Sequence, residues 1–82
     1  MYHFYILYSA SLDRYYTGYT SCSIAERIRR HNSNHAGYTG RASDWLLVYS
    51  EQFDSKTNAK SRESEVKDWK SRKKIEELIG RG

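Results

Sequence analysis

The sequence lacks most of the features that mark secreted and membrane proteins. Its 82 residues include one cysteine and no proline. A single cysteine excludes an intrachain disulfide framework and a zinc cluster built on cysteines. The longest uncharged apolar run, residues 4–8, is far shorter than the ~20 residues that span a bilayer. The N-terminus has neither the basic start nor the cleavage site of a signal peptide. We therefore expect a cytoplasmic protein that has no membrane partner.

Aromatic residues, in contrast, are plentiful. They make up 15% of the chain, with eight tyrosines among them, and 38% of all residues are hydrophobic. This composition argues against disorder, and the length fits a single domain over residues 1–82. Lys and Arg total 14 against 10 Asp and Glu, and the net charge of +4 is compatible with a polyanionic partner.

Three segments have the composition of β-strands. Residues 2–8 and 15–20 are rich in aromatic and branched side chains and are separated by a short polar turn, which predicts an antiparallel hairpin. Residues 45–53 form the third predicted strand, after a polar loop over residues 33–44.

Three helices are predicted around these strands. Ser23 and Glu26 match a capping box, in which the Glu26 side chain accepts a hydrogen bond from the backbone N–H of Ser23. A helix should therefore begin there and end near residues 32–34. Asp54 or Ser55 can cap a second helix, and Gly80 should stop a last one over residues 71–79. The predicted order is β-β-α-β-α-α. This order indicates a mixed α/β fold, in which one small three-stranded antiparallel sheet is flanked by helices.

Glu63 interrupts the apolar pattern of the second predicted helix. Ala59, Val66 and Lys70 lie along one line of that helix, and Glu63 falls on the same inward stripe. A carboxylate that faces a core is costly unless it is paired or binds a metal. A slightly rotated helix would instead let Glu63 pair at the surface with one of three basic neighbours, Lys60, Arg62 or Lys67.

His31 and Arg27 form a second unusual pair. They are one turn apart on the first predicted helix, and His31 shares the inward face with Ile24. Two basic groups at the edge of an apolar face can grip a phosphate. The alternative is a histidine that favours the helix dipole beside an arginine whose stem packs on the surface.

Strand alternation predicts a cluster around Gly18. Tyr5 and Tyr16 can face each other across the hairpin beside this glycine, and a glycine inside a strand usually marks a bulge or a close approach of the backbone. Aromatic pairs of this kind are also ordinary stabilisers of a sheet.

Residues 67–74 contain five basic side chains. They are a candidate surface for phosphate groups, and the solvated face of a helix is an equally good interpretation. The five residues are Lys67, Lys70, Arg72, Lys73 and Lys74.

In combination these features resemble the GIY-YIG nuclease superfamily, in particular its small single-domain bacterial members. The resemblance covers residues 2–79. Its two half-motifs are His3-Phe4-Tyr5 and Tyr16-Thr17-Gly18, and Arg27, His31 and Glu63 follow in family order.

The resemblance implies hydrolysis of phosphodiester bonds in DNA with one divalent cation, Mg²⁺ or Mn²⁺. It makes Glu63 the metal-ligating carboxylate and Tyr16 the general base or the group that orients the attacking water. Tyr5 would polarise the same pocket. Arg27 would stabilise the pentavalent phosphate, and His31 would hold a phosphate or assist proton transfer.

Two classes of function stay open at this point. The first is a small endonuclease that acts on branched, damaged or single-stranded DNA, as in DNA repair. The second is a non-catalytic nucleic-acid-binding module, or an interaction subunit whose protein partner supplies specificity. The retained set of site residues favours the enzyme. The modest charge favours the binding module, and so does the lack of Asn in residues 70–74, where many family nucleases have one.

Overall fold

The computed structural model describes residues 1–21, 23–33 and 42–81. Cys22 and most of the predicted polar loop lie outside these residues. The elements follow the predicted order β-β-α-β-α-α: β1 (Tyr2–Ser9), β2 (Arg14–Thr20), α1 (Ile24–Ser33), β3 (Trp45–Phe53), α2 (Lys56–Asp68) and α3 (Arg72–Arg81). The three-stranded sheet is antiparallel with the order β2-β1-β3, so the predicted mixed α/β fold is confirmed.

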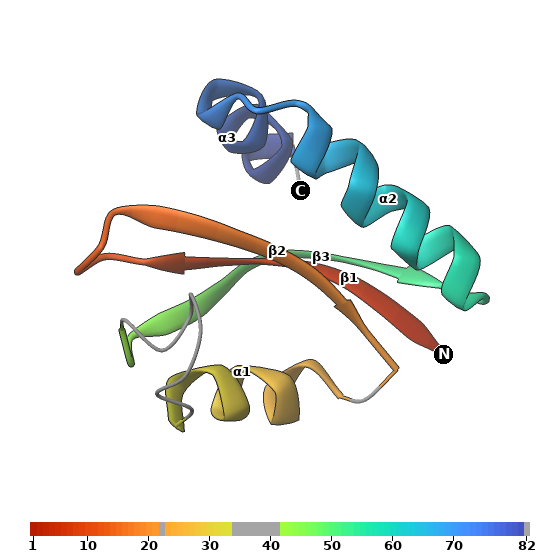
Figure 1. Cartoon of the computed structure of the whole chain (residues 1–82), viewed down its shortest axis with the longest axis horizontal. Helices are drawn as coiled ribbons and strands as arrows, with labels where there is room; N and C mark the ends of the chain where they lie inside the picture. Colours follow the sequence, from red (N-terminus) through yellow and green to blue (C-terminus); the bar gives the residue numbers. More distant parts are fainter. Residues whose placement is uncertain (22, 34–41, 82) are drawn as a thin grey trace.

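The central strand β1 buries side chains on both faces of the sheet. Figure 1 shows α1 on one face and α2 with α3 on the other. Phe4 and Ile6 point toward α2 and pack with Val66, whereas Tyr5 and Leu7 point toward α1 and pack with Trp45 and other residues. A strand covered by helices on both faces carries a continuous apolar run, which explains why residues 4–7 are all buried.

Serine caps begin the helices at the predicted places. The backbone N–H of Glu26 donates to Ser23 Oγ at 3.2 Å, while the Glu26 carboxylate accepts from Arg29. At α2 the cap is Ser55 rather than Asp54, because Ser55 has extended backbone and its Oγ accepts from the N–H of Asn58.

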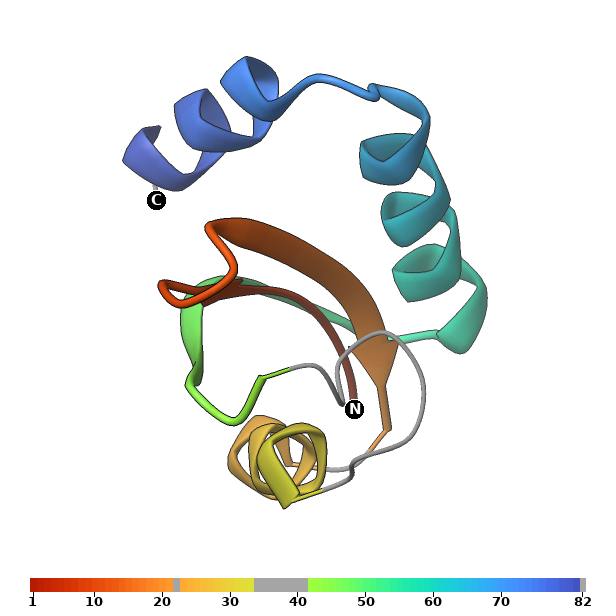
Figure 2. The same cartoon turned by 60° about the vertical axis from the view of Figure 1, so that its left-hand side comes forward.

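The predicted stop at Gly80 is wrong, since α3 continues through this residue to Arg81. Glycine permits the left-handed turn that ends many helices but does not require it. The left-handed turn occurs instead at Lys70, where φ is 48°. This residue was expected on the inward line of α2, but the helix ends at Asp68 and Lys70 lies in the link to α3. Figure 2 shows α2 and α3 on the same side of the sheet with this link between them.

A cluster of polar contacts ties α3 to the turn between β1 and β2. The Asp13 carboxylate accepts hydrogen bonds from Tyr8 and from Arg72 Nη2, both at 2.6 Å, and Arg72 Nη1 donates to the Asp13 carbonyl at 3.0 Å. Arg72 also donates to Glu76 at 3.2 Å. The hydrogen bond from Arg72 has the largest effect on the Asp13 carboxyl, and the one from Tyr8 adds to it. Together they lower its pKa to about 2.

None of the described helices is long and apolar enough to cross a membrane.

The pKa of Asp13 gives a testable prediction for stability. Because the folded-state pKa lies below its usual value of 3.8, the ionised carboxylate stabilises the fold above about pH 4, and this gain is lost as the pH falls toward 2. Asp13→Asn should therefore lower the melting temperature by a few degrees at pH 7, and the difference from wild type should shrink steadily below pH 4.

The matched control is Asp68→Asn, which removes the same charge from an exposed position at the C-terminal end of α2. An acidic residue is unfavourable there, so this change should not lower the melting temperature. Equal melting curves for Asp13→Asn and wild type at pH 7 would show that the Arg72 contact is not stabilising. The measurement is thermal unfolding followed by circular dichroism from pH 2 to 7.

Candidate active site

One cleft gathers side chains from four elements of the fold. It has a volume of about 460 Å³ and lies at the edge of the sheet formed by β2. Its lining includes four of the predicted catalytic residues and the predicted glycine: Tyr5, Tyr16, Gly18, Arg27 and Glu63. His31 is the fifth predicted catalytic residue and lies behind Tyr5, as its contacts show.

The ring of Tyr5 lies directly over Gly18. These residues are partners across the β1–β2 pair. A Cβ atom at position 18 would lie 2.6 Å from the Tyr5 hydroxyl oxygen, so no other residue fits without displacing the ring. Tyr16 is opposite Leu7, two residue pairs along the strands from the Tyr5–Gly18 pair, so the predicted direct Tyr5–Tyr16 pairing does not form. Both tyrosines still point toward the α1 face.

Two residues of α1 hold the Tyr5 hydroxyl in place. Its oxygen lies 3.0 Å from His31 Nε2, and Arg27 Nε donates to it at 3.4 Å. A guanidinium can only donate, so the Tyr5 oxygen is the acceptor of the Arg27 bond and its own proton can go to His31. This arrangement orders the three side chains across the interface between sheet and helix.

Burial shifts the ionisation of this group toward the neutral forms. It raises the pKa of Tyr5, with the Arg27 hydrogen bond acting in the opposite direction. Burial also lowers the pKa of His31, and the positive charge of Arg27 lowers it further. At neutral pH we therefore describe a protonated Tyr5 beside a neutral imidazole. The lowered pKa makes this imidazole a weaker base than a free histidine, and its Nε2 atom is engaged by Tyr5.

Tyr16 is half-buried and stands at the mouth of the cleft. The edge of its ring packs on His31 with the centroids 5.0 Å apart, and Trp45 lies 6.3 Å away on the same face. Lys67 Nζ lies 5.9 Å from the centre of the ring. The ring is thus fixed by packing, with a positive charge close to it.

Glu63 turns a carboxylate from α2 into the same cleft. Its neighbours on the helix, Ala59 and Val66, are fully buried, and the Glu63 side chain is 18% exposed. Lys67 Nζ lies 3.7 Å from its oxygen, so the surface pairing considered from the sequence exists for this one lysine. Arg62 pairs with Glu51 and Glu65 instead.

The described lining of the cleft offers a metal ion a single carboxylate, that of Glu63. Among the residues described by the structure, no group of three or more His, Cys, Asp and Glu side chains could hold a metal ion. A closed site for zinc is therefore missing from this part of the chain. Mg²⁺ commonly takes only one or two protein carboxylates and keeps its water ligands, so Glu63 alone fits this ion or the similar Mn²⁺.

The five predicted basic residues do not form one surface. Lys67 and Lys70 line a groove next to the cleft, whereas Lys74 lines a separate depression with Arg62 and Trp69. Arg72 lines the groove as well, but its guanidinium is bound to Asp13 and Glu76. Lys73 is exposed on α3. We define the groove by six of its lining residues: Tyr15, Val66, Lys67, Lys70, Ser71 and Ile75.

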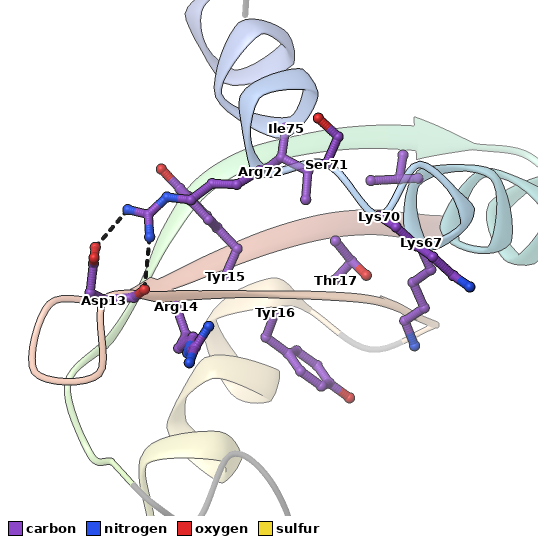
Figure 3. Close-up of a pocket in the computed structure, with 11 residues that line it drawn as sticks. Asp13, Arg14, Tyr15, Tyr16, Thr17, Lys67, Lys70, Ser71, Arg72 and Ile75 are labelled. Atoms are coloured by element: carbon purple, nitrogen blue, oxygen red, sulfur yellow. Dashed lines mark hydrogen bonds and ion pairs between the residues drawn. The ribbon is translucent and has the colours of Figure 1, made fainter.

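Figure 3 shows this groove along the outer edge of β2, below the link between α2 and α3. Lys67 and Lys70 extend toward the side on which Tyr16 and Arg14 project. Tyr16 borders both the groove and the cleft, so the two hollows adjoin at this residue of β2.

Sequence reasoning missed several residues that border these hollows. Tyr2, Tyr19 and Lys56 line the cleft, and Arg14 lines the groove. Tyr2 and Tyr19 are two of the seven tyrosines in the predicted strands, and no local pattern separates them from packing residues. Lys56 could have been found, because a cation at the start of a helix opposes the dipole and its presence there needs a reason.

Comparison with known proteins gives a consistent picture. The profile of the GIY-YIG catalytic domain matches residues 1–76. A UPF0213 protein of Haloquadratum walsbyi is 38% identical over 82 residues, covering 99% of this chain and 90% of its own. A UPF0213 protein of Staphylococcus saprophyticus is 43% identical over 82% of this chain and 80% of its own, and one of Natronomonas pharaonis is 37% identical over 94% and 89%.

No solved structure gives a significant match to the chain. The domain profile covers nearly the whole sequence, and the two half-motifs it describes form the hairpin that builds the cleft. GIY-YIG nucleases generally use a divalent metal, which agrees with the single carboxylate found here. The chain belongs to the GIY-YIG family, a family of nucleases, and its relatives are UPF0213 proteins, which form a small branch of that family.

Proposed function

We propose that the protein is a metal-dependent endonuclease that hydrolyses phosphodiester bonds in DNA. The observation that carries this proposal is the meeting of Glu63, Arg27 and Tyr16 at one cleft, since each comes from a different element of the fold. A packing role would not require a carboxylate, a guanidinium and a phenol to converge on the same hollow. The substrate we favour is structured or damaged DNA, as in DNA repair, with a protein partner supplying specificity in the cytoplasm.

In this proposal Glu63 holds the cation and Arg27 holds the phosphate. Mg²⁺ or Mn²⁺ would neutralise phosphate charge and activate a bound water. The Glu63 side chain is mostly shielded from solvent, which strengthens its attraction for a cation. Arg27 is already oriented by the Tyr5 hydroxyl, so its guanidinium can stabilise the extra negative charge of the pentavalent phosphorus without reorganising.

Tyr16 is our candidate for the group that accepts or orients the proton of the attacking water. A free phenol has a pKa of about 10, so its phenolate needs positive charge nearby. The ammonium group of Lys67 lies near the Tyr16 ring, and a cation at Glu63 would bring a second positive charge to the cleft. His31 is the second candidate, but its Nε2 atom faces the Tyr5 hydroxyl and the residue is 8% exposed. We assign to His31 the positioning of Tyr5.

One observation favours the second class of function, a nucleic-acid-binding module. The ammonium group of Lys67 already lies against the Glu63 carboxylate and can neutralise it without a metal. In a binding module this pair would persist, and the cleft would hold a phosphate through Arg27 alone. Cation binding at Glu63 therefore separates the two functions.

Glu63→Gln tests the proposed metal site. This change keeps the shape of the side chain and removes its charge, so the fold should be retained while Mg²⁺ and Mn²⁺ binding and DNA cleavage are lost. Binding is measured by isothermal titration of each ion, and cleavage by single-turnover assays on plasmid, single-stranded and branched DNA. Glu65→Gln is the control, because Glu65 is exposed on the same helix and pairs with Arg62. Wild-type cleavage by Glu63→Gln would refute the assignment.

Tyr16→Phe tests proton transfer separately from packing. Removal of one hydroxyl leaves the ring contacts with His31 and Trp45, so the melting temperature and DNA affinity should be unchanged. The single-turnover rate should fall by roughly 10²–10⁴-fold if Tyr16 acts as the base. Tyr15→Phe is the matched control on the same strand, since its hydroxyl donates to Glu76 outside the cleft. An unchanged rate for Tyr16→Phe would direct attention to His31.

A further inference from the structure

We propose that the groove beside the cleft binds the nucleotide next to the scissile phosphate with its base unpaired, so that the preferred substrate is single-stranded or locally opened DNA. This inference rests on the proposed function, because it takes the cleft as the place of the scissile phosphate. The groove and the cleft share Tyr16 on the edge strand β2, so a DNA strand that crosses this edge at Tyr16 passes from one hollow into the other.

The size and lining of the groove suit a single nucleotide. Its volume is about 370 Å³, within the range of pockets that hold small organic ligands. Tyr15, Val66 and Ile75 lie on the same face of the sheet and give the groove an apolar lining, which favours the face of a base over a phosphate. In a duplex both faces of each base are covered by its neighbours, so only an unpaired or displaced base can reach such a lining.

The rim of the groove supplies cations for the phosphates that flank this base. Lys67 is half exposed, and its distance of 3.7 Å from Glu63 makes that ion pair easy to exchange. A metal ion at Glu63 would repel the lysine, which could then turn to a phosphate in the groove. Arg72 is different, because Asp13 and Glu76 already neutralise it. Its role is to hold α3 above the groove.

Lys70 provides an independent sign of a binding site. It follows the end of α2 in the left-handed conformation, with φ at 48°, at a position where glycine is the usual residue. Unfavourable backbone conformations of this kind cluster at ligand sites. Lys70 forms no ion pair with another described residue, so the strained turn presents an uncompensated charge to the groove.

The test is a binding assay without divalent metal, so that cleavage cannot interfere. Three fluorescein-labelled probes of about 12 nucleotides are compared in EDTA: a single DNA strand, its duplex, and an abasic strand of the same length. Wild-type protein should bind the single strand about tenfold more tightly than the duplex or the abasic strand, since stacking of one base is worth roughly 5- to 150-fold in affinity.

Variants locate the site. Lys70→Met keeps the length of the side chain and removes its charge, so the slope of log Kd against log salt for the single strand should fall by about 0.7. Lys60→Met, an exposed lysine on a different face of α2, should leave the slope unchanged. Crosslinking with 5-iodouracil in the single strand should modify the tryptic peptide of residues 15–27, which contains Tyr15 and Tyr16.

The outcomes distinguish this inference from the proposed function. Equal affinity for the three probes, an unchanged slope in Lys70→Met or crosslinks outside residues 15–27 would overturn the groove as a nucleotide site, even if metal-dependent cleavage is observed. A clear preference for the single strand in a protein that cleaves no DNA would support the groove and refute the endonuclease. The binding assay therefore tests the groove, and the cleavage assay tests the endonuclease.

Discussion

The contact between Tyr5 and Gly18 is the constraint on which the rest of the site depends. The absence of a side chain at position 18 lets the Tyr5 ring lie flat across the neighbouring strand, and the hydroxyl then reaches α1. There it meets His31 and Arg27, which fixes the helix against the sheet and aims the arginine at the cleft. A methyl group at Gly18 would collide with the ring of Tyr5, so the hairpin and the helix could not keep this arrangement.

The charges of the protein fall into two groups with different roles. Arg62 and Arg72 are bound by two acidic residues each and join elements of the fold, as Asp13 does for the turn and α3. The cations around Tyr16 have looser partners or lie in a strained turn. Lys67 has one ion pair, at 3.7 Å from Glu63, and Lys70 forms none with another described residue. These two lysines therefore do not join elements of the fold as Arg62 and Arg72 do.

Local sequence signals predicted much of the architecture. Strand composition, the serine caps and the alternation of Phe4, Tyr5, Ile6 and Leu7 are short-range features, and the structure follows them closely. The errors also have a local cause. Gly80 has the chemistry of a helix stop but continues the helix, while Lys70 adopts the left-handed turn that the sequence would assign to glycine. Propensity is a weak preference that does not decide the conformation of a single residue. A Cβ atom at Gly80 would meet no described atom within 4 Å beyond the backbone of its own helix, so no packing contact with these residues accounts for its place in the helix.

For the candidate site, too, some features were predicted from the sequence and others depend on the folded structure. The sequence by itself determined the order of the elements and, through resemblance to a family, the set Tyr5, Tyr16, Arg27, His31 and Glu63. Only the tertiary structure decided that Tyr5 is buried while Tyr16 lines the cleft, that Arg72 is engaged by Asp13, and that a groove adjoins the cleft. Periodicity indicates which face of an element a residue occupies, but which distant residue that face meets depends on the packing of β1, β2, α1 and α2 against one another. Burial, hydrogen bonding and charge pairing all arise from that packing, so the chemistry of each side chain was fixed only when the chain folded.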